Sequence, residues 1–350
     1  MDPVRLAVIG AGGIGARHVA LALAEPACEL AAIVDPAPEA AELAAEAGVA
    51  HFADHEALLG TEPPEGAIIA TPNALHLPVG LAFAKHGVPM LVEKPIAESV
   101  AAGAELVAAA EAAGVALAVG HMRRFDPAVG AAKAIIESGE IGRLVALSAV
   151  WAIRKPDAYF DVTWRRQDGG GPVLLNLIHD LDMLRYLAGD IESVTAETSN
   201  TNRGFEVEDT AAILLRFESG ALGAVTLSDT APSPWGWERA TGENPIIPAS
   251  GENCFRFLGD HGALDYPGLD LWRHDGPGPG GWDQPIHRQS GPELSERASL
   301  AAQLAQFCRV VRGLEAPKVS GADGLATLAA TMAVLESARL GRPVRPGDLS

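Results

Sequence analysis

Three glycines near the N-terminus constrain the fold of this chain more than any other feature. Gly10, Gly12 and Gly15 directly follow the strand-like run at 6–9 and open a helical stretch at 14–24. In a βαβ unit the first glycine permits a tight turn, the second lets the backbone approach a pyrophosphate, and the third packs the helix on the strand. The helix then presents free N–H groups to the phosphates. The pattern predicts a dinucleotide-binding loop; the alternative is a purely structural glycine turn.

An acidic residue at the end of the next apolar run supports the same interpretation. Asp35 stands 20 residues after Gly15, where a carboxylate accepts hydrogen bonds from the ribose hydroxyls. A carboxylate would repel a 2′-phosphate and residues 36–38 supply no cation, so NAD is favoured over NADP. Arg17 is the basic side chain that could reach the site and weaken this preference. The predicted cofactor contacts at this end are Gly10, Gly12, Gly13, Ile14, Gly15 and Asp35.

The first 122 residues alternate short apolar runs with alanine-rich helical stretches. Alternation of this length is typical of βαβ units, so we predict an α/β Rossmann domain, a doubly wound parallel sheet, over residues 1–122. The expected strands are 6–9, 30–34, 67–70, 90–92 and 115–119, and the expected helices are 14–24, 39–47, 75–86 and 100–113.

The remainder is dominated by strands, which indicates an α+β domain with an open, mainly antiparallel sheet over residues 123–322. The segment 323–350 is expected to be a C-terminal helix and tail that pack back near the Rossmann domain. Pro and Gly predict long loops at 232–251 and 274–281. The expected strands are 144–153, 194–198, 210–217, 221–228, 254–258 and 269–272, and the expected helices are 128–137, 174–187, 295–312 and 323–340.

Composition limits the partners and the compartment. The 26 basic and 45 acidic residues give a net charge of −19, which disfavours nucleic acid and anionic membranes as partners. No apolar run approaches the ~20 residues of a membrane span, and no basic or apolar leader precedes the first strand, so we expect a cytoplasmic protein. Cys28, Cys254 and Cys308 have neither disulfide nor metal-ligand spacing, and no metal site is predicted.

A polar loop follows the third predicted strand. In the run from Ala70 to His76, Thr71 and Asn73 stand at the carboxyl end of a parallel strand, where such sheets bind ligands. They are therefore candidates to line the cofactor. The alternative is that one of them caps the helix that begins nearby.

Glu93, Lys94 and Pro95 follow the next predicted strand. A dehydrogenase must remove a hydroxyl proton as hydride leaves the carbon, and a lysine near the oxygen can stabilise the developing charge. Lys94 stands at the carboxyl end of this strand, on the side of the sheet where the cofactor is expected to bind. Glu93 either holds the lysine or contacts the cofactor. Pro95 restricts Lys94 to extended geometry and makes a cis bond accessible. The alternative is an ordinary surface lysine.

A glycine triplet introduces a second polar cluster. Gly169 to Gly171 precede a helical run that carries Asn176, His179 and Asp182. Spacings of three residues place Asn176 and His179 on neighbouring turns of one face. The alternative is a buried helix with a satisfied histidine, in which Asp180 and Asp182 are solvated or capping.

Basic residues flank the segment before the glycine triplet. Because an arginine fork matches a carboxylate, we hypothesise that one of Arg154, Lys155, Arg165 and Arg166 binds a substrate carboxylate. An ordinary salt-bridged loop is the alternative. Further along, Trp235 and Trp237 are candidates to cover a subunit or substrate surface.

Taken together, these motifs resemble the Gfo/Idh/MocA family, which includes glucose–fructose oxidoreductase, inositol dehydrogenase and the rhizopine-catabolism proteins. The markers extend over nearly the whole chain: the glycine loop, Ala70–Asn73, Glu93–Pro95, Gly120–Phe125, Trp164-Arg165, the triplet with His179, and Glu336–Ala338.

The resemblance implies that Lys94 and His179 form the catalytic pair, with His179 as the general base. It implies a homodimer or homotetramer built through the C-terminal sheet, and small-molecule substrates such as sugars, inositols and polyols. The remaining cofactor contacts expected from the markers are Thr71, Pro72, Asn73, His76, Glu93 and Lys94, and the expected substrate contacts are Arg124, Trp164, Arg165, Asn176 and His179.

One departure concerns the second cluster. Many members of the family carry an aspartate four residues before the catalytic histidine, where this chain has Leu175. Asn176, one residue later, can orient a hydroxyl but cannot accept its proton. A relay assisted by aspartate is therefore not expected.

The predicted function is NAD-dependent oxidation of a secondary alcohol in a sugar, inositol, polyol or cyclic diol, with a carboxylated substrate included. An NAD-dependent glycosidase that oxidises its substrate transiently is one alternative, and it would release product without net NADH. A non-catalytic NAD-binding regulator is another, and it would bind ligands without turnover.

Overall fold

The computed structural model describes residues 2–276, 278–292 and 298–349. The chain divides into two compact units, Met1–Phe125 with Ala298–Leu328, and Asp126–Arg297 with Ala329–Leu349. A segment near the C-terminus thus belongs to the first unit. It belongs there because Leu304 and Phe307 are buried in the hydrophobic core of the N-terminal sheet.

The first unit contains a six-stranded parallel sheet with the order β3-β2-β1-β4-β5-β6, which confirms the predicted Rossmann domain. Its strands are β1 Val4–Ile9, β2 Cys28–Val34, β3 Ala50–Phe52, β4 Gly66–Ile69, β5 Met90–Val92 and β6 Leu117–Val119. Its helices include α1 Gly13–Ala24, α2 Pro38–Ala47, α3 His55–Leu59, α4 His76–Lys85, α5 Val100–Ala113 and α9 Ser299–Val311.

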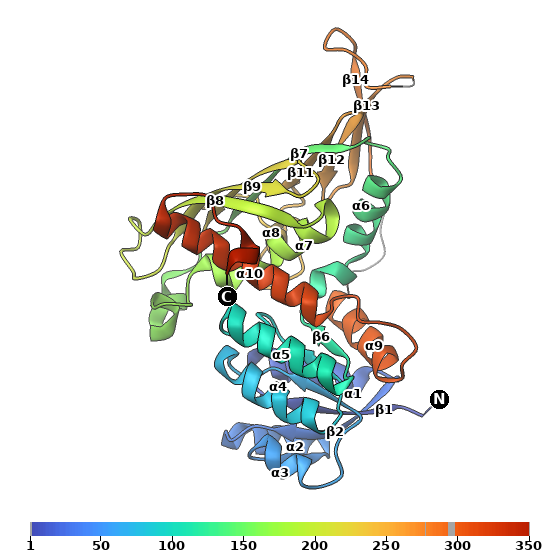
Figure 1. Ribbon diagram of the computed structural model, residues 1–350, viewed down its shortest axis with the longest axis vertical. Helices are drawn as coiled ribbons and strands as arrows, with labels where there is room; N and C mark the ends of the chain where they lie inside the picture. Colours follow the sequence, from blue (N-terminus) through green and yellow to red (C-terminus); the bar gives the residue numbers. More distant parts are fainter. Residues whose placement is uncertain (1, 277, 293–297, 350) are drawn as a thin grey trace. The chain divides into compact units, whose positions relative to one another are not determined.

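Helices cover both faces of this sheet (Figure 1). Apolar residues of α1, α2 and α9 pack on one face, while α4 and α5 pack with each other and α4 lies against β4 and β5. The strands are therefore buried on both sides, as their continuous apolar runs indicate. The strand order reverses between β1 and β4, and ligands of such sheets bind at the carboxyl ends of the strands at that point.

The second unit contains an eight-stranded sheet with the order β14-β13-β12-β11-β7-β10-β9-β8. Within this sheet, β7 and β10 are the only described neighbours that pair in parallel, so the prediction of a mainly antiparallel sheet is confirmed. The strands are β7 Leu144–Ala152, β8 Ile191–Ser199, β9 Thr210–Phe217, β10 Leu222–Ser228, β11 Phe255–Gly259, β12 Gly262–Tyr266, β13 Asp270–His274 and β14 Ile286–Gln289.

One face of this sheet is covered by α6 Pro127–Glu137, α7 Ile178–Ala188 and the second half of α10 Gly321–Leu340 (Figure 1). Buried and exposed residues alternate strictly along β9, which is typical of a sheet with one solvated face. Leu214, Leu222 and Leu258 lie on that exposed face.

Several short elements were not predicted: β3, β12, β14, α3 and α8 Trp237–Thr241. The strands β3 and β14 contain no buried residue, so they carry no apolar pattern that sequence reasoning could recognise. Helix α8 lies inside the expected loop at 232–251. Its Trp237 is fully buried and stacks on Tyr266 at 5.6 Å between ring centroids, so the expected surface role of Trp237 is wrong. Trp235 is 42% exposed.

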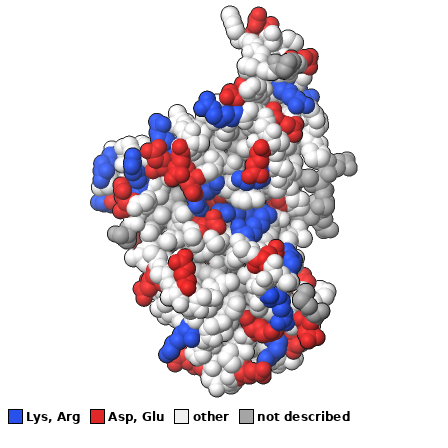
Figure 2. Space-filling view, turned by 45° about the vertical axis from the view of Figure 1, so that its right-hand side comes forward, with Lys and Arg blue, Asp and Glu red and all other residues white. Residues whose placement is uncertain are grey.

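Other surface and core features bear on partners. Figure 2 shows Asp and Glu side chains spread over the visible surface, with Lys and Arg in small groups among them. None of the helices in the described part of the chain has the length and apolarity to cross a membrane. The three cysteines are buried free thiols.

Candidate active site

The glycine loop divides into packed and open positions. Gly10 has a φ of +92°, and a Cβ there would lie 2.6 Å from the Ala70 carbonyl oxygen. A Cβ on Gly15 would lie 1.9 Å from the Gly10 carbonyl oxygen. By contrast, a Cβ built on Gly12 or Gly13 would have no atom of the described residues within 4 Å, apart from its neighbours in the chain. The first and third glycines of the motif therefore serve close packing, and the second leaves open space on the outer side of the loop.

Asp35 is fixed against this loop. Its Oδ2 accepts the Ala11 N–H at 2.8 Å and its Oδ1 accepts the Ala37 N–H at 2.8 Å. Helix α1 begins after Gly12, which has no side chain with which to cap it. Its first N–H groups are consequently available to an anion.

The polar loop after β4 does not cap a helix. A short 3₁₀ turn, Asn73–Leu75, precedes α4, and neither Thr71 nor Asn73 provides a side-chain cap, so the capping interpretation is wrong. The Thr71 hydroxyl is buried and has no hydrogen-bond partner among the described residues.

His76 ties this loop to the next one. Its Nδ1 lies 2.8 Å from the Pro95 carbonyl oxygen and its Nε2 lies 2.9 Å from the Thr71 carbonyl oxygen. Burial lowers the pKa of His76, although the two carbonyl contacts oppose this shift. The imidazole is only 1% exposed, so a buried side chain links the loop after β4 to the loop after β5.

These features fit a nicotinamide dinucleotide. The open glycine positions leave room for a pyrophosphate over an uncapped helix N-terminus, and the Asp35 carboxylate lies beside the same loop. The Thr71 hydroxyl, which the described residues leave without a hydrogen-bond partner, supplies a further polar group at the carboxyl end of β4.

Glu93 and Lys94 follow β5, and the Lys94–Pro95 peptide is cis. The Glu93 carboxylate is buried and lies 2.7 Å from His18 Nε2, and its Oε2 accepts the Lys94 N–H at 3.2 Å. Burial alone would raise the pKa of Glu93, but the His18 hydrogen bond and the nearby Lys94 charge outweigh it and hold this pKa below its ordinary value. Lys94 itself is half-buried.

Sequence reasoning missed His18. The available signal was a lone histidine on the apolar face of α1, beside the buried Val19 and Ala22 and three residues after Gly15.

Each glycine of the 169–171 triplet has its own mechanical role. Gly169 adopts a φ of +81°, and a Cβ on Gly170 would lie 2.4 Å from the Trp164 carbonyl oxygen. A Cβ on Gly171 would lie 2.2 Å from a carboxylate oxygen of Glu208. The triplet therefore permits a tight turn and two close approaches immediately before the second polar cluster.

That cluster lies on a helix that starts with a π turn, Val173–Leu177, and continues as α7. Glu208 Oε1 accepts the Val173 N–H at 2.8 Å, and burial raises the pKa of Glu208. Glu208 thus caps this helix, a role that its position before β9 did not reveal. Turns of π type occur frequently at functional sites.

Asn176 and His179 are both half-buried. The Asn176 Oδ1 has no hydrogen-bond partner among the described residues, so the amide retains an acceptor for a ligand. Asp180 and Asp182 are at most 1% exposed, so the interpretation of these residues as solvated is wrong.

The basic side chains are mostly engaged. Arg154 pairs with Asp157 at 3.2 Å, and Lys155 lies 3.5 Å from Asp229. Arg165 donates to the Tyr159 carbonyl at 2.8 Å and stacks over that ring at 4.0 Å. Arg166 is exposed.

The other two expected substrate contacts differ in exposure. Trp164 is 50% exposed. Arg124 is buried and forms an ion pair with Asp323 at 3.2 Å.

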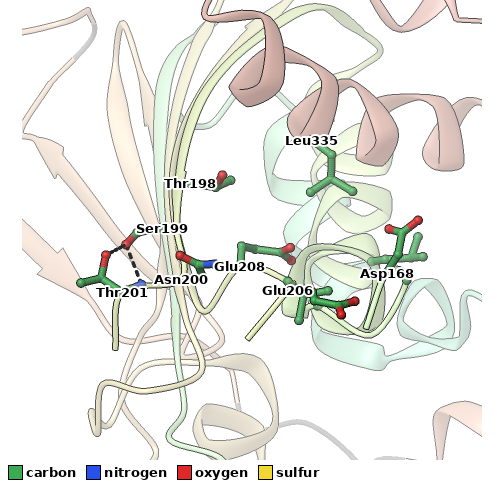
Figure 3. Close-up of a pocket in the computed structure, with 12 residues that line it drawn as sticks. Asp168, Thr198, Ser199, Asn200, Thr201, Glu206, Glu208 and Leu335 are labelled. Carbon is green, nitrogen blue, oxygen red and sulfur yellow. Dashed lines mark hydrogen bonds between the residues drawn. The ribbon is translucent and has the colours of Figure 1, made fainter. Parts of the chain in front are cut away.

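A cavity of about 480 Å³ in the second unit was not predicted (Figure 3). It lies between the glycine triplet, the end of β8 and the segment before β9, with Leu335 of α10 at one side. Three acidic side chains that line the cavity are labelled in Figure 3: Asp168, Glu206 and Glu208. No group of His, Cys, Asp and Glu side chains suited to a metal ion occurs in the described ranges. None of the predicted site residues lines this cavity.

Comparison with known proteins gives matches over both units. Residues 4–121 match a family model described as an oxidoreductase family with an NAD-binding Rossmann fold. Residues 129–265 match the GFO/IDH/MocA C-terminal domain.

Individual relatives agree with this assignment. The chain is 33% identical to a scyllo-inositol 2-dehydrogenase (NAD(+)) of Bacillus subtilis over 238 residues, 65% of this chain and 68% of the relative. It is 29% identical to a D-apiose dehydrogenase of Paraburkholderia graminis, over 97% of this chain and 88% of the relative.

Among solved structures, an oxidoreductase from Agrobacterium radiobacter in complex with NAD+, L-tartaric acid and magnesium is 26% identical, with a TM-score of 0.83 over 99% of both chains. The two family matches together cover most of the chain, and the Rossmann fold of the first match agrees with the parallel sheet of the first unit. This chain therefore belongs to the GFO/IDH/MocA family of oxidoreductases, whose N-terminal part is an NAD-binding Rossmann fold.

Proposed function

We propose that this protein is an NAD-dependent dehydrogenase that oxidises a secondary alcohol of a sugar, inositol, polyol or cyclic diol. The observation that carries the proposal is the position of Lys94. It follows β5 at the carboxyl edge of the parallel sheet that carries the glycine loop and Asp35. Ligands of doubly wound sheets bind at this edge, so an ammonium group there is close to where a substrate oxygen would lie.

In the proposed reaction the bound nicotinamide supplies the hydride acceptor. Lys94 holds the hydroxyl oxygen of the substrate and stabilises the charge that develops on it as the C–H bond breaks. His179 takes the hydroxyl proton as general base. Asn176 orients a neighbouring hydroxyl through its amide, since it cannot act as a proton acceptor.

NAD rather than NADP is the proposed cofactor. The Asp35 carboxylate is anchored by two backbone N–H groups, which keep its charge beside the glycine loop. A 2′-phosphate placed there would meet a fixed negative charge, whereas ribose hydroxyls could donate hydrogen bonds to it.

The substrate class is proposed from the relatives. Proteins about 30% identical to this chain are named for scyllo-inositol and D-apiose, and the similar Agrobacterium radiobacter structure holds L-tartaric acid. All three molecules carry adjacent hydroxyl groups, and tartaric acid also carries carboxylates. Arg165, whose Nε has no hydrogen-bond partner in the described part of the chain, is the proposed contact for such a carboxylate.

The test is a screen for NADH formation at 340 nm over sugars, inositols, aldonic and hydroxy acids and cyclic diols. We expect at least one substrate to reduce NAD, and we expect the His179→Ala variant to lose that activity while it still binds NAD. Product release without net NADH would point to transient oxidation. Ligand binding without turnover over the whole panel would point to a regulator.

A further inference from the structure

Beneath the proposed catalytic lysine lies a buried imidazole that the proposed reaction does not use. His18 is 0% exposed and belongs to α1, the helix that follows the glycine loop. Its Nε2 lies 2.7 Å from Glu93 Oε1, at the end of β5. A carboxylate so deeply buried needs a charged or hydrogen-bonding partner, and His18 provides one.

The second carboxylate oxygen of Glu93 is also engaged. Oε2 accepts the Lys94 backbone N–H at 3.2 Å, so one carboxylate joins the His18 ring to the lysine peptide. A Cβ on Gly120 would lie 2.8 Å from the same oxygen, so the absent side chain leaves room for the carboxylate. The Glu93 carboxylate is thereby held by His18 on one oxygen and by the Lys94 N–H on the other.

The ring has a preferred protonation pattern. His18 Nδ1 is buried and has no hydrogen-bond partner among the residues that the structure describes. An N–H at Nδ1 would therefore be left without an acceptor, which costs more than an unused lone pair. Of the two tautomers of an uncharged ring, the geometry favours the one that carries its proton on Nε2 and donates it to Glu93.

We propose that His18 is a positioning residue for Lys94: its Nε2–H holds the Glu93 carboxylate, which in turn fixes the Lys94 peptide at the end of β5. The catalytic meaning of this role rests on the proposed function of Lys94. This role requires His18 to supply one N–H donor at the position of its Nε2 atom. This role requires no contact of His18 with substrate or cofactor.

Two substitutions of His18 distinguish the effect of its hydrogen-bond donor from the effect of its side-chain volume. His18→Gln keeps an N–H donor at about the position of Nε2, whereas His18→Leu fills the site without a donor. Val19→Ala is the matched control, since Val19 is the neighbouring buried residue of the same helix and does not contact Glu93 through a hydrogen bond.

The first readout is the rate of backbone hydrogen exchange in the segment 93–96, measured by mass spectrometry. This measurement needs no substrate. Pro95 has no N–H, so the Lys94 amide contributes a large share of this signal. We expect exchange of that amide to be about tenfold faster in His18→Leu, because a hydrogen bond to a charged group is weakened, and near the native rate in His18→Gln and Val19→Ala. In a Glu93→Ala background, His18→Leu should add no further acceleration.

The second readout is kinetic. His18→Leu should lower kcat by about 10- to 100-fold with little change in the KM for NAD, and His18→Gln should restore most of the loss. Unchanged exchange in His18→Leu, or equal effects of Leu and Gln, would overturn the role of His18. If none of the compounds in the screen supports NAD reduction by the native protein, the proposed function fails. The exchange measurement needs no substrate, so it still decides the role of His18.

Discussion

At the scale of single residues, Lys94 is the side chain on which the proposed hydride transfer most depends. We expect Lys94→Ala to lower kcat by at least about 100-fold, because the charge on the substrate oxygen loses its partner. The affinity for NAD, measured by fluorescence titration, should change little. Lys85→Ala is the control, since Lys85 is an exposed lysine at the end of α4. Full turnover in Lys94→Ala would reject its catalytic role.

Asp35 decides the choice of cofactor through its charge. Asp35→Asn should lower kcat/KM with NAD by about 10- to 100-fold, because hydrogen bonds to a charged acceptor are lost. The same change should raise the ratio of NADP to NAD activity, since it removes the repulsion of a 2′-phosphate. Initial rates with both nucleotides check this. A native enzyme that already prefers NADP would contradict the expectation.

At the scale of elements, the helix that carries Asn176 and His179 depends on Glu208 at its first turn. Glu208→Ala removes an acceptor from the Val173 N–H and should destabilise the second unit by about 1 kcal/mol, or roughly 2–4 °C in Tm. Gly171→Ala should have a similar effect, because its Cβ displaces the same carboxylate. The two effects should not add in the double variant, and thermal unfolding measures this coupling.

The pH dependence of this cap has a definite sign. Because burial raises the pKa of Glu208 in the folded chain, its stabilising contribution is complete below the unfolded pKa and is lost as pH rises through the folded pKa. Glu208→Gln keeps a carbonyl acceptor without the buried charge. Its Tm should therefore exceed that of the native protein near pH 8, and the difference should vanish below about pH 4. A larger gain at low pH would contradict this account.

At the scale of the whole molecule, the solvated face of the eight-stranded sheet is the proposed surface of self-association. Leu214 on β9 is 61% exposed there, and Leu222 on β10 is 49% exposed. We expect a dimer or tetramer in sedimentation velocity, and Leu214→Glu should dissociate it by burying an unpaired charge. Leu23→Glu on α1, where the leucine is 54% exposed, is the control and should leave the oligomer intact. A monomeric native protein would reject this surface.

Local patterns were sufficient for most of the architecture. The spacing of Gly10, Gly12 and Gly15, the acid at Asp35 and the alternation of apolar runs specify a Rossmann domain, because each reflects a steric or electrostatic requirement within a few residues. The polar positions of α7 were likewise visible as interruptions of an apolar run. Short elements such as β3 and β14 were not predictable, since their residues are mostly exposed and their pairing partners lie elsewhere in the chain.

The sequence by itself determined where the chemistry-bearing residues stand, since Lys94 follows a buried strand and His179 interrupts an apolar helix. Only the tertiary structure decided which side chains hold others in place. His18 meets Glu93 across 75 positions, and Glu208 reaches the helix N-terminus across 35. No local spacing encodes such contacts. They arise because packing brings distant backbone segments together and leaves each buried polar group to find a partner.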